Sequence, residues 1–145
     1  MKTFFGGVTL AAACALLADS AGAQSAMEAA ALFPLANEPA PKLFVSPPLP
    51  GPLARGAVLI QYRLENFRVL PVIGESALNV SPRAGHLHVN VDDLPWVWAD
   101  TSGTNTIVVN GLPPGEHKVR IELADPTHRI YTGETVTFTV PTMTK

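Results

Sequence analysis

The stretch that decides the fold is Gly85-His86-Leu87-His88-Val89-Asn90-Val91, and a second one, His117-Lys118-Val119-Arg120-Ile121-Glu122-Leu123, repeats its pattern. In both, apolar and polar side chains alternate, which is the period of a β-strand with one face buried. The apolar positions of the two strands are therefore expected to face inward and to form the core: Leu87, Val89, Val91, Val119, Ile121 and Leu123.

The sequence on either side of these stretches has the same texture. Short apolar segments predict further strands at residues 57–64, 67–72, 77–80, 104–109, 129–131 and 135–140. Turn residues separate them, among them Asn110-Gly111 and Pro113-Pro114-Gly115. No long helical period follows Phe33. About seven strands in roughly 85 residues predict an all-β fold, an immunoglobulin-like antiparallel β-sandwich.

The first 23 residues have the order of a secretory signal peptide. Lys2 precedes an apolar run over residues 4–18, and Ala21-Gly22-Ala23 supplies small residues for cleavage after Ala23. The run is shorter than the roughly 20 residues that a membrane-spanning helix needs. Ala11-Ala12-Ala13-Cys14 loosely resembles a lipobox, but Leu10 stands one position too early, so lipidation is not expected. We predict a periplasmic or secreted protein with no membrane span after cleavage.

Residues 24–56 are predicted to be a proline-rich leader that precedes a β-sandwich domain at 57–145. Residues 25–33 could form one short helix, with Ser25 as its cap. Seven prolines follow between Pro34 and Pro52. Because proline has no amide donor and favours extended neighbours, this stretch is expected to be a spacer or an edge arm and not a core element.

Composition excludes several classes of protein. A chain of 145 residues has room for one domain, and ten basic against twelve acidic side chains leave no basic stripe for nucleic acid. One cysteine excludes an internal disulfide framework and a cysteine-based zinc cluster. The chain has neither a Gly-x-Ser-x-Gly nucleophile motif nor a phosphate-binding glycine loop, and we do not expect an enzyme.

The histidines form the candidate site. His86 and His88 share one face of their strand, with Cα atoms about 6.7 Å apart. Imidazole suits copper, zinc and nickel, and we expect His86 and His88 to bind copper or zinc together with His117 or His128. Asp92 is a candidate outer ligand or a hydrogen-bond partner of a ligating histidine. His117 and His128 flank a strand about 20 Å long, so they lie at opposite ends of the domain unless His128 loops back.

Other interpretations stay open at this point. The histidines could be polar residues of a solvated strand face, with one rim histidine bonded to the backbone. The domain would then be a structural or protein-interaction module of the cell envelope, with the proline arm or the Trp96/Trp98 pair docking a partner. A weaker alternative is an enzyme that uses a histidine and Asp92 or Asp93 as an acid–base pair.

Two longer motifs carry a resemblance to a family. They are Ser81-Pro82-Arg83-Ala84-Gly85-His86-Leu87-His88-Val89-Asn90-Val91-Asp92-Asp93 with Pro95-Trp96-Val97-Trp98-Ala99-Asp100, and Gly111-Leu112-Pro113-Pro114-Gly115-Glu116-His117 with Leu123-Ala124-Asp125-Pro126-Thr127-His128. Over residues 57–140 the chain resembles a family of uncharacterised exported bacterial domains. The resemblance implies a β-sandwich of unknown function, and it leaves the leader at 24–56 outside.

Overall fold

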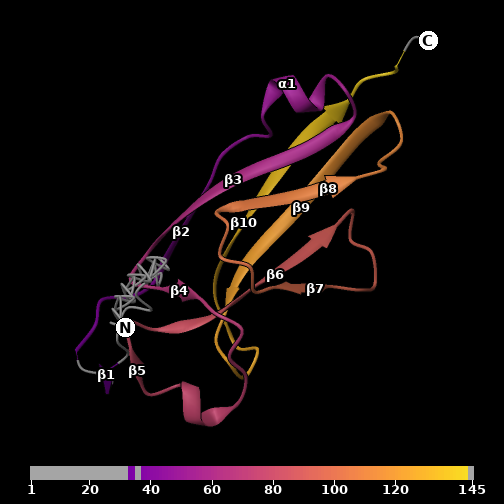
Figure 1. Cartoon of the computed structure of the whole chain (residues 1–145). Helices are drawn as coiled ribbons and strands as arrows, with labels where there is room; N and C mark the ends of the chain where they lie inside the picture. Colours follow the sequence, from indigo (N-terminus) through magenta and orange to yellow (C-terminus); the bar gives the residue numbers. More distant parts are fainter. Residues whose placement is uncertain (1–32, 35–36, 144–145) are drawn as a thin grey trace, which may run out of the picture. The chain divides into compact units, whose positions relative to one another are not determined.

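The computed structural model of the chain describes residues 33–34 and 37–143, with no side chains at 33–34. The predicted signal peptide and the predicted helix at 25–33, apart from its last residue, lie outside this range. The described elements are β1 (Phe33–Pro34), β2 (Lys42–Val45), α1 (Pro50–Leu53), β3 (Ala57–Glu65), β4 (Arg68–Val69), the 3-10 helix η1 (Glu75–Ala77), β5 (Val80–Ser81), β6 (Ala84–Val91), β7 (Trp98–Asp100), β8 (Thr106–Asn110), β9 (Gly115–Ala124) and β10 (Ile130–Val140) (Figure 1).

The strands form two main sheets and one small pairing. One sheet has the order β10-β9-β6-β4, with β7 also paired to β6, and the other has the order β2-β3-β8. β1 pairs with β5. All pairings are antiparallel except that of β4 with β6, which is parallel and departs from the antiparallel sandwich expected.

The core lies between the two main sheets. Buried side chains from β3 and β8, such as Val58, Ile60 and Ile107, belong to the same cluster as those from β6 and β9. All six side chains predicted to face inward from the two deciding strands are buried in it. The prediction of an all-β fold is confirmed, and two sheets around a shared core are consistent with a sandwich.

The structure corrects the predicted elements in three places. Residues 42–45, assigned to the leader, form β2, whose Leu43 is buried in the core, so the domain begins before residue 57. This strand occupies a proline-free window at a sheet edge, where flanking prolines are tolerated. η1 occupies the start of the strand predicted at 77–80, after Gly74 with φ of 97°. β7 was not predicted, because its three residues are too few to show a period.

β6 is the strand that positions the candidate site. It lies inside its sheet, with β9 on one side and β4 and β7 on the other. In its register with β9, His86 lies opposite Ala124, the last residue of β9. The connection from β9 to β10 therefore starts beside His86. Within the described part of the chain, no helix is both long and apolar enough to cross a membrane.

Candidate metal centre

Two histidines reach the site from β6. Leu87 and Val89 point into the core, so the alternation of the strand places His86 and His88 together on the opposite face. This face is not a solvated one at His86, which is only 1% exposed, and His88 is half-buried. The sequence predicted the shared face correctly, but it gave no sign that His86 is buried.

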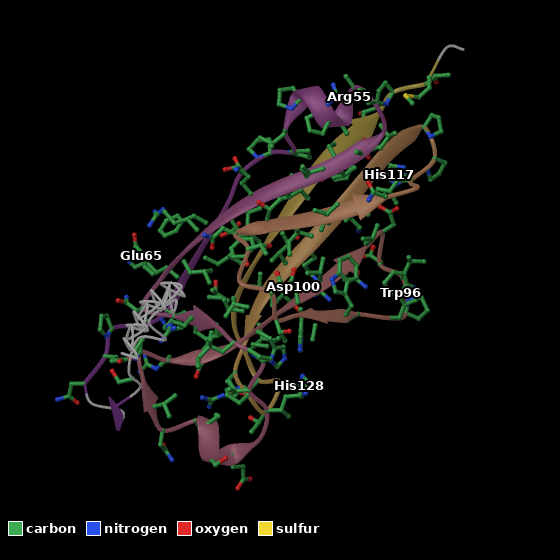
Figure 2. The ribbon with its side chains drawn as sticks, in the orientation of Figure 1. Arg55, Glu65, Trp96, Asp100, His117 and His128 are labelled. Carbon is green, nitrogen blue, oxygen red and sulfur yellow. The ribbon has the colours of Figure 1, made fainter. Side chains whose placement is uncertain are left out.

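The third histidine comes from the connection between β9 and β10. His128 follows the turn that begins at Asp125, and its amide donates to the Asp125 carbonyl at 2.9 Å. Its backbone is left-handed, with φ of 67°, a conformation in which histidine is enriched among residues other than glycine. The turn folds back toward β6, so that His128 meets His86 and His88 while His117 lies at the other end of the domain (Figure 2).

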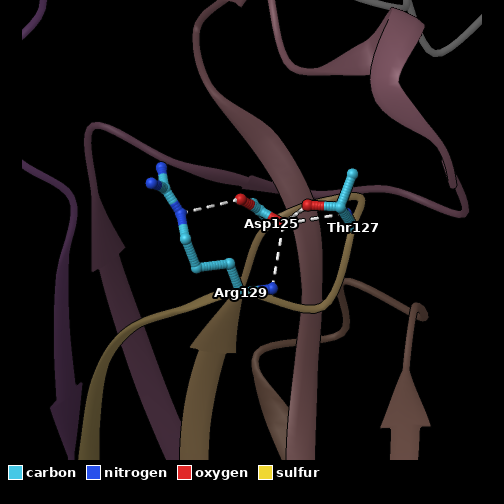
Figure 3. Close-up of polar contacts among 3 residues, drawn as sticks. All are labelled: Asp125, Thr127 and Arg129. Atoms are coloured by element: carbon cyan, nitrogen blue, oxygen red, sulfur yellow. Dashed lines mark hydrogen bonds and ion pairs between the residues drawn. The ribbon is translucent and has the colours of Figure 1, made fainter.

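The side chain of Asp125 holds this turn in shape (Figure 3). Its Oδ1 accepts hydrogen bonds from the Thr127 amide at 2.8 Å, the Thr127 hydroxyl at 2.7 Å and the Arg129 amide at 3.0 Å. Its Oδ2 accepts from Nε of Arg129 at 3.3 Å. Asp125 thus fixes the residues on both sides of His128. Sequence reasoning missed this role, although an aspartate followed by a proline, as at Asp125, is a known signal for the start of a turn.

The electrostatics of Asp125 agree with this role. Its side chain is only 1% exposed. Burial alone would raise the pKa of the carboxyl, but the hydrogen bonds from Thr127 and Arg129 outweigh it and hold the pKa below its usual range. Asp125 is therefore ionised at neutral pH, and its two carboxylate oxygens are charged hydrogen-bond acceptors.

The three histidines bring three ring nitrogens into a nearly equilateral triangle. Nε2 of His86 is 3.1 Å from Nε2 of His88, and Nδ1 of His128 is 3.0 Å from each of them. Among the described residues, these three form the group whose ligand atoms could hold one metal ion. The structure thus brings together three of the five predicted ligands, and it chooses His128 over His117 as the third histidine.

Hydrogen bonds cannot satisfy this triangle. Each nitrogen presents either a proton or a lone pair, and a hydrogen bond needs one of each. Three nitrogens share only two possible states, with a proton or with a lone pair, so at least two of them must be in the same state. Two lone pairs or two N–H groups therefore face each other at 3.0–3.1 Å. A cation shared by three lone pairs removes the conflict. The geometry is compatible with a ligand set for one ion and not with a fully satisfied hydrogen-bond network.

Burial also prepares the rings as ligands. Desolvation lowers the pKa of His86, and the neighbouring His88 and His128 lower it further. Desolvation likewise lowers the pKa of His88, followed by the effect of His128. Both rings are therefore neutral at pH 7 and carry the lone pair that a metal requires.

The remaining two predicted ligands, His117 and Asp92, form a separate pair. His117 is seven residues from Ala124 along β9, about 23 Å at the rise of a strand. Its Nδ1 lies 2.7 Å from Oδ2 of Asp92, and its Nε2 lies 2.8 Å from the Pro113 carbonyl oxygen. Neither residue belongs to the histidine triangle.

The surroundings of His117 favour its protonated ring over a neutral ring with a free lone pair for a metal. Both partners of its ring accept hydrogen bonds only, so both ring nitrogens donate when the ring is protonated. The hydrogen bond to Asp92 accordingly raises the pKa of His117, and the Pro113 carbonyl adds to this. Because Nε2 is held by Pro113, it is not free to accept a proton from a substrate. This geometry gives no support to an acid–base pair.

The tryptophan pair lies on the loop before β7 and at its start. The ring centroids of Trp96 and Trp98 are 5.8 Å apart, and Trp96 is exposed while Trp98 packs against the core. The buried Asn90, on the histidine face of β6, donates to the carbonyls of Leu94 and Trp96 and holds this loop. No metal ligand comes from this segment in the described group.

Fold and site together define a class of protein: a small all-β domain whose outer sheet face carries a three-histidine candidate metal centre. Over residues 2–145 the chain matches the model described as Family of unknown function (DUF6130), and it belongs to that family. The match agrees with the resemblance to an uncharacterised family and extends it to the segment before residue 57. No curated protein and no solved structure matches the chain.

Proposed function

We propose that this domain binds one divalent transition-metal ion through Nε2 of His86, Nε2 of His88 and Nδ1 of His128. The observation that supports the proposal is the triangle of ring nitrogens, with sides of 3.0–3.1 Å. Nitrogens 2.0–2.1 Å from a zinc ion fit a triangle of about this size.

The ligand chemistry favours copper or zinc. The site offers imidazole only, and imidazole suits late first-row metals, whereas calcium and magnesium prefer oxygen ligands. Copper(II) is the strongest binder of the divalent series, with zinc also well suited to nitrogen ligands. We therefore place copper and zinc ahead of the other divalent ions.

We further propose that the domain acts as an exported binding module in the periplasm or outside the cell. The proposal rests on the signal-peptide order of residues 1–23. If cleavage follows Ala23, the only cysteine, Cys14, leaves with the signal, and the histidines are then the natural transition-metal ligands. Intact-mass spectrometry of the exported protein tests this, and a mass that does not correspond to a chain beginning at Gln24, with or without loss of ammonia, contradicts the cleavage site.

Calorimetric titration of the untagged chain with Cu²⁺ and Zn²⁺ tests metal binding. We expect one site, and we expect His88→Ala or His128→Ala to weaken it by more than the roughly 10–100-fold typical of outer-shell changes. His117→Gln is the matched control, since it removes a histidine outside the triangle and should leave the affinity within about twofold of the parent. Absence of saturable binding, or equal losses in all three variants, refutes the proposal.

A further inference from the structure

The triangle supplies only three protein ligands to an ion. Among the residues that the structure describes, the group of ligand atoms within reach of one another contains no carboxylate and no fourth histidine. Resting on the metal site proposed above, we propose that the bound ion keeps adjacent coordination positions open and takes up a small anionic ligand that chelates it through two oxygens. The following geometry and charges support this.

The size of the triangle sets the angles at the ion. For nitrogens 2.0–2.1 Å from the metal and 3.0–3.1 Å from one another, the N–metal–N angles are about 95°. A tetrahedral site with the same bond lengths needs nitrogens about 3.3–3.4 Å apart. The three histidines therefore fit one face of an octahedron. The opposite face then has neighbouring positions about 90° apart, which a five-membered chelate ring can span.

An ion at these bond lengths would lie about 1 Å out of the plane of the three nitrogens, so one side of it would not be covered by them. Burial decreases from His86 through the half-buried His88 to the exposed His128. A ligand can therefore approach from the His128 side without displacing the core.

The charge around the site favours an anion. Three neutral imidazoles leave the full double charge on the ion. Two carboxylates lie near enough to act on the histidines, Asp125 on His86 and Glu122 on His88, and each is also paired with an exposed arginine: Asp125 with Nε of Arg129 at 3.3 Å, and Glu122, opposite His88, with Arg120 at 3.2 Å. Neither carboxylate belongs to the group of ligand atoms, so neither neutralises the ion by coordination, and the ion keeps positive charge for a ligand from solution.

Cobalt(II) gives a direct test, because its d–d absorption reports coordination number and ligand exchange. The whole chain is loaded with one equivalent of Co²⁺ and titrated with sodium oxalate, a two-oxygen chelator, and separately with sodium acetate. We expect a saturable one-to-one spectral change, with oxalate binding at least about 100-fold more tightly than acetate because its second oxygen binds intramolecularly. The metal should stay with the protein on gel filtration. The His117→Gln variant should respond as the parent does, and the metal-free chain should not bind oxalate.

The outcomes separate this inference from the proposal on which it rests. If the chain binds no metal, both fail. If Co²⁺ binds but oxalate leaves its spectrum unchanged, the protein closes the coordination sphere and only the inference fails. Equal affinities for oxalate and acetate would indicate a single open position, and removal of Co²⁺ by oxalate would indicate competition in place of a ternary complex. Either result overturns the inference while leaving metal binding intact.

Discussion

Substitution of Asp125 by alanine separates the positioning of His128 from the stability of the fold. The change removes the acceptor of three hydrogen bonds through Oδ1 and of a fourth through Oδ2. The ion pair with Arg129 contributes little, because that side chain is 74% exposed and solvent screens it. The hydrogen bonds at Oδ1 are what the substitution tests.

The expected magnitude follows from these contacts. Hydrogen bonds to a charged acceptor contribute about 1.5–3 kcal/mol each, but Thr127 and Arg129 are exposed, so water replaces part of what is lost. We expect Asp125→Ala to lower the free energy of unfolding by about 2–4 kcal/mol and Asp125→Asn, which keeps an acceptor, by about 1–2 kcal/mol.

Metal affinity should fall as well. The left-handed backbone of His128 costs about 1–2 kcal/mol, and without the Asp125 carboxylate only the backbone hydrogen bonds of the turn offset this cost before the metal binds. At about 1.4 kcal/mol per factor of ten, the dissociation constant should rise about 5–30-fold. Urea unfolding of the metal-free chain and calorimetric titration with Zn²⁺ measure the two effects.

The control and the refuting result are specific. Asp93→Ala also removes one carboxylate, but Asp93 pairs with Lys118 away from this turn and should leave zinc affinity unchanged. If Asp125→Ala loses stability and still binds zinc within twofold of the parent, Asp125 supports the fold only, and the argument that it positions His128 is refuted.

Three further predictions concern single residues. His86→Leu should abolish zinc binding in calorimetry. It should leave the stability of the metal-free chain to urea unchanged or higher by about 1 kcal/mol, because it removes a buried Nδ1 that has no hydrogen-bond partner, and a large loss of stability contradicts this. The stabilising effect of His117, measured against His117→Gln, should be fully present below about pH 6.5 and should shrink as the pH rises through its raised pKa. A difference in unfolding free energy between the parent and His117→Gln that grows toward pH 9 would have the wrong sign. Gly85→Ala should lower the melting temperature strongly, because the added Cβ would overlap the Ala124 carbonyl oxygen and approach Cζ of Phe67 to 2.8 Å; an unchanged melting temperature would show that β6 and β9 can move apart.

The alternation of side chains made much of the fold predictable. It correctly placed the six inward residues of the two deciding strands in the core and His86 and His88 on one face. It could not assign residues 42–45, because four residues between prolines give too short a period, and pairing with β3 decides their structure. It also gave no sign of β7, which is extended because Ala99 pairs with His88. The extended structure of a short strand depends on the strand with which it pairs, and the local sequence does not reveal which strand that is.

The choice between His117 and His128 needed the three-dimensional register. On the sequence both flank the same strand, and both could complete a site with His86 and His88. The register of β6 with β9 puts Ala124 opposite His86, which brings the following turn to the cluster and leaves His117 near the far end of the pairing. Pairing register depends on the packing of both sheets, so no local motif around either histidine reveals it.

What surrounds each ring then decides what it can do. The carboxylate of Asp92 and the carbonyl of Pro113 raise the pKa of His117 and so favour its protonated form, and the ring joins the turn after β6 to the start of β9. The neighbours of His86 are other imidazoles in a buried setting, and these disfavour a second charge and keep the lone pair. The pKa values of two histidines in one small domain are thus shifted in opposite directions, that of His86 downward by burial and by the neighbouring imidazoles and that of His117 upward by its hydrogen-bond partners. Placing a carboxylate next to His88 should likewise favour the protonated form of that ring and weaken it as a metal ligand. Zinc titration of Ala99→Asp, which adds a carboxylate opposite His88 on β7, would reveal this as tighter proton retention and a steeper loss of zinc affinity as the pH is lowered.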